Sequence, residues 1–375
     1  MCYYTNWSQY RVGDGKFLPE DIDAFLCTHI MYAFAKLNGN SLTNYEWNDP
    51  DNGGTQGLYS RVMNMREANP SLKVILTLGG ANAPSADFST MVSTILNRGV
   101  FVSSAVQFLR QHRFDGLDMD WEYPTQRGGS PGDFTNFGLL MQELRSEFEA
   151  EALVSGKERL LLTVAVPPSK SIIDSSFDVP TISANVDYVG VMAYNFFGSW
   201  NTETGHNSPL YASSGGAVSF SMSYAVNYWH QLGVPKDKIV VGMAAYGRSF
   251  TLSDPNNYGV GAPTGSGSAP SGTYTGEAGF LSYYEICMKQ VSGAGNTYRD
   301  DSSKVPYYVE GTTWIGFDDE DSIYNKVRNF IIPQGYAGAM IWALPLDDFK
   351  PMCGANRYPL VKKIKEAFDE VAVSK

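Results

Sequence analysis

Carboxylates alternate along one short stretch of this 375-residue chain, and their spacing suits acid–base chemistry. The segment DGLDMDWEYP at 115–124 places Asp118, Asp120 and Glu122 two residues apart. Side chains two apart on a strand share a face, so these three acids are expected to point to one side, with Glu122 nearest the C-terminal end. Asp115 has the other parity and is expected to be structural.

Three carboxylates on one buried face repel one another, and burying them costs free energy that Val, Ile or Leu would not cost. Their crowding also raises the pKa of one or more of them, which keeps an acid protonated near neutral pH. The pattern therefore predicts a general acid that protonates a leaving group. A solvated acidic edge or a Mg²⁺ site is the alternative, but Mg²⁺ keeps several waters for which a packed interior has little room.

Eight short apolar or β-branched runs could position these acids, and helical patterns follow most of them. The runs cover 2–7, 28–34, 74–79, 116–121, 160–166, 188–192, 239–243 and 339–344. The helical stretches cover 55–69, 100–111, 134–152, 221–232 and 322–332. Eight βα units predict an α/β fold, a closed TIM (β/α)₈ barrel, with a doubly wound open sheet as the alternative. Active sites of such barrels lie at the C-terminal ends of the strands, where Glu122 falls.

The spacing of the units breaks once, before the last run, where roughly 70 residues exceed what one βα loop needs. The excess includes a Gly/Ser/Pro-rich stretch at 259–272. We therefore expect a small α+β insertion subdomain over 247–318, after the seventh strand. The barrel then occupies 1–246 and 319–375.

The composition excludes several classes of partner. A net charge of −11 and a pI near 4.9 disfavour nucleic acid and anionic membranes, which this surface would repel. No stretch approaches the roughly 20 apolar residues of a membrane span, and 43% hydrophobic with 18% charged residues is typical of a folded, soluble chain. The 23 Tyr and 7 Trp mostly fill a core, but rings in a groove can stack on sugars.

The four cysteines and four histidines form no CxxC or HExxH pattern, so no metal and no cofactor are expected. Disulfides are the better interpretation of the cysteines. The chain begins in a strand-like run without an apolar leader, and paired cysteines would imply that a signal peptide was removed. The expected location is therefore secreted and extracellular.

The acidic segment resembles the DxxDxDxE signature of glycoside hydrolase family 18, the chitinases and chitinase-like lectins. Similar segments extend along nearly the whole chain: CYYTNW (2–7), THIMYAFA (28–35), LTLGG (76–80), VMAYNFFGSW (191–200), AAYGRSF (244–250), EAGFLSYYEIC (277–287) and GAMIWALPLDDF (338–349). Their order resembles that of animal-type chitinases, which carry an α+β insertion after the seventh strand.

The resemblance implies a retaining hydrolysis in which the 2-acetamido oxygen of the substrate attacks the anomeric carbon. Glu122 would protonate the glycosidic oxygen and later activate water. Asp120 would hold the acetamido N–H and stabilise the oxazolinium ion, while Asp118 shares a proton with Asp120. Tyr194 would bind the acetamido oxygen.

Further substrate-binding residues follow from the same match. Trp342 would form the floor under the sugar at the cleavage point, with Met192 beside Tyr194. The residues that match other cleft positions are Tyr3, Phe34, Trp200, Tyr246 and Arg248. The chain departs from the family at two positions, since Asn195 stands where Asp is usual and Ala81 follows the paired glycines where Trp is common. The first departure affects the pH dependence, and the second removes a stacking platform.

The expected function is hydrolysis of β-1,4 bonds in chitin, with chitin and N-acetylglucosamine oligomers as partners and a monomeric state. A chitinase-like lectin without turnover is the alternative, against which Glu122 argues, and the insertion argues against an endoglycosidase acting on N-glycans. Cys2 is expected to pair with Cys27, because both open neighbouring strands. Cys287 is expected to pair with Cys353, which ties the insertion to the loop after the last strand.

Overall fold

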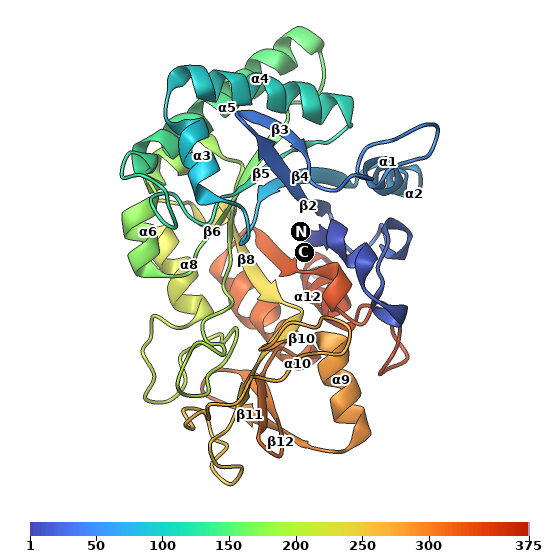
Figure 1. Ribbon diagram of the computed structural model, residues 1–375, viewed down its shortest axis with the longest axis vertical. Coiled ribbons are helices and arrows are strands. Elements are labelled where there is room, and N and C mark those ends of the chain that lie inside the picture. Colours follow the sequence, from blue (N-terminus) through green and yellow to red (C-terminus); the bar gives the residue numbers. More distant parts are fainter. Residues whose placement is uncertain (374–375) are drawn as a thin grey trace. The chain divides into compact units, whose positions relative to one another are not determined.

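A closed TIM barrel of eight parallel strands forms the core of the fold, as predicted (Figure 1). The computed structural model describes residues 1–373. The sheet order is β1-β14-β8-β7-β6-β5-β4-β2-β3, and β1 also pairs with β2. Its strands are β1 (Cys2–Thr5), β2 (His29–Asn38), β3 (Ser41–Asn44), β4 (Lys73–Gly79), β5 (Gly116–Asp120), β6 (Leu161–Val166), β7 (Tyr188–Val191), β8 (Ile239–Ala244) and β14 (Gly338–Trp342). The ninth strand, β3, pairs antiparallel with β2 outside the barrel.

The barrel strands are continuous apolar runs because both faces of a parallel sheet are covered. Strand β4 is buried from Val74 to Gly79, and β5 is buried along its whole length. The acids on β5 interrupt this apolar pattern. Hence these acids stand out among strands whose other residues are mostly apolar and buried.

Helices and short turns connect the strands. The α-helices are α1 (Leu58–Met63), α2 (Met65–Ala68), α3 (Ser85–Val92), α4 (Ile95–Gln111), α5 (Asp133–Ser155), α6 (Lys170–Ser176), α7 (Val179–Asn185), α8 (Met222–Gln231), α9 (Tyr283–Ser292), α10 (Glu320–Asn325), α11 (Ile332–Gln334) and α12 (Pro359–Val373). The 3₁₀ turns are η1 (Asn6–Tyr10), η2 (Gly13–Gly15), η3 (Pro19–Asp21), η4 (Lys236–Lys238) and η6 (Leu344–Leu346), and η5 (Lys326–Ile331) is π-helical. Among the described residues, no helix is long and apolar enough to cross a membrane.

Helix α4 begins five residues earlier than the sequence pattern suggested, at Ile95 rather than Val100. The hydroxyl of Thr94 accepts a hydrogen bond from the Asn97 N–H and caps the helix there. Gly99 has a low helix propensity and weakens the helical pattern near this start. For this reason the sequence pattern predicted a start at Val100.

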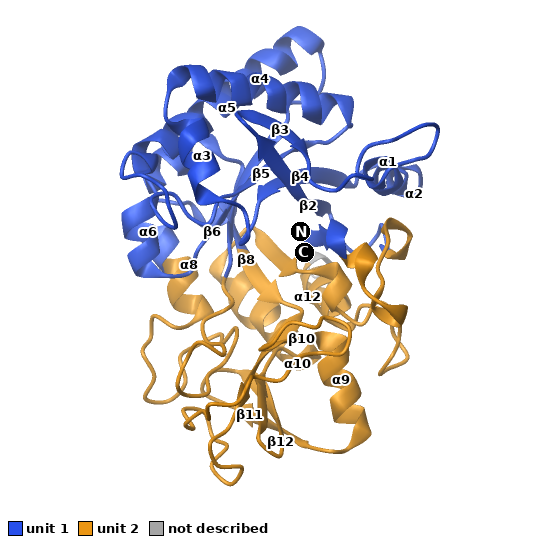
Figure 2. Cartoon of the chain, viewed as in Figure 1, with its two compact units in different colours: residues 1–7, 22–192, 228–240 blue, residues 8–21, 193–227, 241–375 orange. Residues whose placement is uncertain are grey.

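The chain divides into two compact units (Figure 2). The first comprises 1–7, 22–192 and 228–240, and it contains β1 to β7. In this unit, the ion pairs Arg98–Glu143 and Arg110–Glu151 join α4 to α5. The second comprises 8–21, 193–227 and 241–375.

The second unit contains a separate antiparallel sheet of order β10-β9-β13-β12-β11. Its strands are β9 (Tyr246–Thr251), β10 (Phe280–Ser282), β11 (Asn296–Asp300), β12 (Val305–Glu310) and β13 (Thr313–Gly316). Phe250, Leu252 and Trp314 are buried in a small apolar core on this sheet. The expected subdomain bounds of 247 and 318 remain a prediction.

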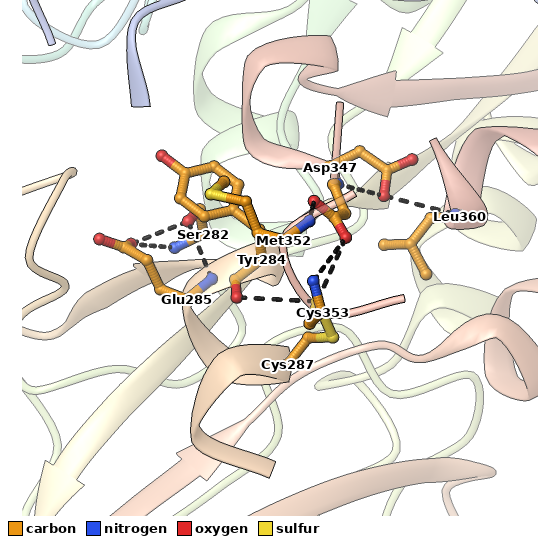
Figure 3. The surroundings of a disulfide bond; sticks show 9 residues. Ser282, Tyr284, Glu285, Cys287, Asp347, Met352, Cys353 and Leu360 are labelled. Atoms are coloured by element: carbon orange, nitrogen blue, oxygen red, sulfur yellow. Dashed lines mark hydrogen bonds between the residues drawn. A yellow bond between two sulfur atoms is a disulfide. The ribbon is translucent and has the colours of Figure 1, made fainter. Parts of the chain in front are cut away.

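Both predicted disulfides, Cys2–Cys27 and Cys287–Cys353, are confirmed. Figure 3 shows the second bridge between α9 and the segment after β14. Beside it, Glu285 accepts hydrogen bonds from the Ser282 hydroxyl and N–H, which caps α9. The bridge therefore fastens the middle of α9 to the segment after β14 within the second unit.

Candidate active site

The three acids lie at the end of β5, within the first unit. Strand β5 ends at Asp120, and Glu122 follows two residues later. Asp118 and Asp120 are 2% and 3% exposed, whereas Glu122 is half-buried. A peptide bond in the cis conformation joins Glu122 to Tyr123. Glu122, the acid just beyond the strand end, is thus the most accessible of the three to solvent.

Asp118 is held by three hydroxyls, two from the neighbouring strands β4 and β6 and one from β1. Strand register places Thr77 of β4 and Thr163 of β6 opposite it. The Thr163 hydroxyl donates to Oδ1 at 2.6 Å, while Tyr3 and Thr77 donate to Oδ2 at 2.9 and 3.2 Å. Burial raises the pKa of Asp118, and these three hydrogen bonds offset part of the rise.

Asp120 is the most strongly perturbed of the three. Burial, followed by the charges of Glu122 and Asp118, raises its pKa well above the ordinary value. Within residues 1–373, its Oδ1 atom is buried without a hydrogen-bond partner. A buried acceptor left unpaired costs free energy, which a ligand N–H could recover.

Glu122 also has a raised pKa, caused by burial. A hydrogen bond from Tyr123 and the positive charge of Arg127 lower it in part. Arg127 donates from one Nη atom to the carbonyl oxygens of Glu122 at 3.1 Å and Ala81 at 2.6 Å. A carboxyl group with a raised pKa can carry a proton at the pH where an ordinary glutamate is ionised, so Glu122 is suited to general acid catalysis.

The paired glycines after β4 allow the close packing of this strand end. Gly79 has a φ of +118°, and a Cβ there would lie 2.0 Å from the carbonyl oxygen of Asp120. A Cβ on Gly80 would lie 2.5 Å from the ring of Phe34. Phe34 in turn stacks on Trp7, with ring centroids 5.5 Å apart. The glycines therefore let β4 approach both the acidic strand and this aromatic pair.

The second unit brings together Asn195, Tyr246, Arg248 and Trp200. The Tyr246 hydroxyl and the Arg248 Nε–H donate to Asn195 Oδ1 at 2.8 and 2.9 Å. Asn195 has a φ of +59°, a left-handed conformation that Asn adopts more readily than most residues. The Arg248 guanidinium lies 5.2 Å from the ring centre of Trp200, whose residue is 58% exposed. This cluster presents an exposed ring beside a fixed cation.

The other three expected site residues end strands or follow them. Met192, directly after β7, is buried and donates its N–H to the carbonyl of Val166 in the first unit. In the second unit, Tyr194 is buried and packs edge-on to Tyr246 with centroids 6.1 Å apart. Trp342, the last residue of β14, is half-buried.

Sequence reasoning missed the supporting residues Thr77, Thr163 and Arg127. The two threonines lie within the apolar strands β4 and β6. The register of these strands with β5 puts side chains that face the same side opposite one another, and this could have indicated the threonines as partners of Asp118. Arg127 lies in a Gly-rich loop with no periodic signal. Among the described residues, no cluster of three or more His, Cys, Asp or Glu side chains could hold a metal ion.

Comparisons with known proteins place these residues in a family. The sequence model described as glycosyl hydrolases family 18 matches residues 1–347. Chitotriosidase-1 of Mus musculus is 42% identical over 370 residues, covering 98% of this chain and 77% of the relative. The solved chitinase TsES1 of Trichuris suis has a TM-score of 0.92 and 42% identity, with 98% of each chain covered.

A chitinase-like relative matches almost as well. Human YKL-39, described as a pseudo-chitinase with retained chitooligosaccharide binding properties, has a TM-score of 0.91 at 38% identity, with 98% of each chain covered. The resemblance found in the acidic segment thus extends over the fold. The chain belongs to glycoside hydrolase family 18.

Proposed function

We propose that this protein is a chitinase that hydrolyses β-1,4 bonds between N-acetylglucosamine units with retention of configuration. The observation that carries the proposal is the raised pKa of Glu122, which lies just beyond the end of β5. Asp118 and Asp120, both buried, precede it at intervals of two residues. Family membership supplies the substrate class.

In the first step, Glu122 donates its proton to the glycosidic oxygen as the bond from that oxygen to the anomeric carbon breaks. The acetamido oxygen of the same sugar attacks the anomeric carbon from the opposite face and forms an oxazolinium ion. In the second step, Glu122 takes a proton from water. The water oxygen attacks the anomeric carbon, and the bond from that carbon to the acetamido oxygen breaks, which opens the oxazolinium ring. Two inversions give net retention.

Asp120 accepts the acetamido N–H and balances the positive charge of the oxazolinium ion. Its unpaired buried Oδ1 supports this role, because an incoming donor would satisfy it. Asp118 shares a proton with Asp120, and the three hydroxyl donors to Asp118 fix the orientation of its carboxylate.

The remaining residues bind sugar. Tyr194, with Met192 beside it, donates its hydroxyl to the acetamido oxygen. Trp342 stacks under the sugar at the cleavage point. The rings and polar groups that contact neighbouring sugars are Tyr3, Phe34, Asn195, Trp200, Tyr246 and Arg248. We further propose a secreted, extracellular monomer with an insertion subdomain at 247–318; the two disulfides support the location.

A lectin without turnover is the second candidate, because human YKL-39 binds chitooligosaccharides as a pseudo-chitinase. Glu122 favours the enzyme, since a lectin needs no proton donor with a raised pKa.

Product analysis on N-acetylglucosamine oligomers separates the two candidates. The native protein should shorten the oligomers. Glu122→Gln should bind them with similar affinity yet lose nearly all turnover, because an amide of the same volume cannot serve as the acid. If the native protein leaves the oligomers unchanged, the enzyme proposal is wrong and the lectin proposal remains. If Glu122→Gln keeps most of the native rate, Glu122 is not the general acid.

A further inference from the structure

A fully buried lysine lies in the second unit. Lys326 is 0% exposed and begins the π-helical segment η5. Its Nζ atom lies 2.5 Å from Oδ1 of Asp318, whose side chain is 1% exposed. Taking both ions of such a pair out of water has a desolvation cost that can exceed their attraction, so the pair is a poor source of stability alone. Short π-helical segments in proteins frequently mark functional sites.

The other contacts of Lys326 lead to Ser208. Nζ donates to the Ser208 carbonyl oxygen at 2.5 Å and to its hydroxyl oxygen at 3.3 Å. An ammonium group has three N–H donors, so these two bonds and the one to Asp318 use all of them. Because the Ser208 hydroxyl accepts from Lys326, its single proton is directed elsewhere. It donates to the carbonyl oxygen of Ala193 at 2.7 Å.

Asn207, which precedes Ser208, holds the backbone on the other side of Tyr194. Its Oδ1 accepts the N–H of Asn195 at 3.0 Å, and its carbonyl oxygen accepts the N–H of Phe196 at 3.1 Å. Its Nδ2 donates to the Tyr246 carbonyl oxygen at 3.0 Å. The backbone is thus held at Ala193 on one side of Tyr194 and at Asn195 and Phe196 on the other.

We infer that Lys326, acting through Ser208, is a positioning residue that sets the backbone, and hence the hydroxyl, of Tyr194. This inference rests on the proposed function, which assigns Tyr194 to the acetamido oxygen. Lys326 itself touches no substrate. Its role is to hold Ser208 so that the Ser208 hydroxyl reaches Ala193. Positioning groups of this kind matter because a displacement of about 1 Å can cost a hundredfold in rate.

A double-mutant cycle with Tyr194→Phe tests the inference. Ser208→Ala removes the bond to Ala193 and leaves the Lys326–Asp318 pair intact. It should lower kcat/KM on N-acetylglucosamine oligomers about tenfold when Tyr194 is present, the size expected for one well-made hydrogen bond. In the Tyr194→Phe background there is no hydroxyl left to place, so the same change should cost about twofold or less. Ser208→Thr keeps a hydroxyl and should restore most of the activity.

Lys326→Met combined with Asp318→Asn removes both buried charges and should show the same dependence on Tyr194. If this double variant does not fold, Ser208→Ala can still overturn the inference, because Lys326 is inferred to act through Ser208 alone. The control is Arg98→Met with Glu143→Gln, an ion pair of the first unit whose arginine is similarly buried. This pair should change kcat/KM by the same factor with or without the Tyr194→Phe change.

Equal losses from Ser208→Ala in the two backgrounds would overturn the positioning role while leaving the chitinase proposal standing. Absence of turnover by the native protein would instead overturn the proposed function. In that event the same cycle is measured as the dissociation constant of a chitin hexamer. Additive effects on that constant would overturn the inference too, and smaller losses in the Tyr194→Phe background would support it.

Discussion

Thr163→Val probes how Asp118 is held inside the barrel. Valine keeps the branched shape of threonine and suits a strand, so the change removes little more than the hydroxyl. That hydroxyl makes the shortest of the three hydrogen bonds to Asp118, at 2.6 Å, and Thr163 is 2% exposed. Thr77→Val is the matched control, because its hydroxyl donates to the same carboxylate at 3.2 Å from a fully buried position.

A hydrogen bond to a charged group contributes about 1.5–3 kcal/mol, so we expect Thr163→Val to lower the free energy of unfolding by about 2 kcal/mol near pH 8. The pKa of Asp118 is raised on folding, chiefly by burial. The folded state therefore binds its proton more tightly, and stability falls as pH rises through the interval between the unfolded and folded pKa values. Losing a donor to the carboxylate raises the folded pKa further and widens that interval.

The extra loss in Thr163→Val should consequently shrink toward about 1 kcal/mol near pH 4, because a larger share of Asp118 carries its proton in the folded state there than at pH 8. Urea denaturation of both variants at the two pH values measures this. Thr77→Val should show the same trend with a smaller amplitude. A Thr163→Val loss that is independent of pH, or smaller than that of Thr77→Val, would contradict the account of Asp118.

Two further predictions concern the neighbourhood of Glu122. Arg127→Gln should raise the pKa of Glu122 and move the alkaline limb of the pH–rate profile upward. The shift should be only a few tenths of a unit, because Arg127 is exposed and solvent screens its charge. Arg127→Lys is the control, and a downward shift would contradict the assignment. Ala81→Trp should add about 1 kcal/mol, roughly fivefold in affinity, for long oligomers only, and equal gains for dimers and hexamers in a binding titration would show that position 81 lines no outer subsite.

The sequence was sufficient for the barrel because its signals are local. Most of the barrel strands are short, nearly continuous apolar runs bounded by turn residues, and the acids on β5 are conspicuous because they break such a run. The hairpin from β2 to β3 was missed, although Gly39 follows Asn38 at the turn with a φ of +56°, a signal that could have indicated it.

Contacts between residues far apart in the chain could not be predicted from the sequence. Lys326 lies in a segment expected to be helical, and a single lysine there normally belongs to a solvated face. Its burial depends on Asp318 and on Ser208, which is 118 positions away. Likewise, nothing local in β1 predicts that the Tyr3 hydroxyl reaches Asp118, 115 positions along the chain. Such contacts follow only from the assembled fold.

The anomeric form of the first product tests the central claim most directly. Attack by the acetamido oxygen, followed by water from the face that the leaving sugar occupied, retains the configuration at the anomeric carbon. Proton NMR of an N-acetylglucosamine oligomer, recorded in the first minutes after adding the native protein, should show the β-anomer before mutarotation mixes the two forms. Initial α-anomer, or a sugar trapped covalently on a carboxylate, would contradict the substrate-assisted mechanism assigned to Glu122 and Asp120.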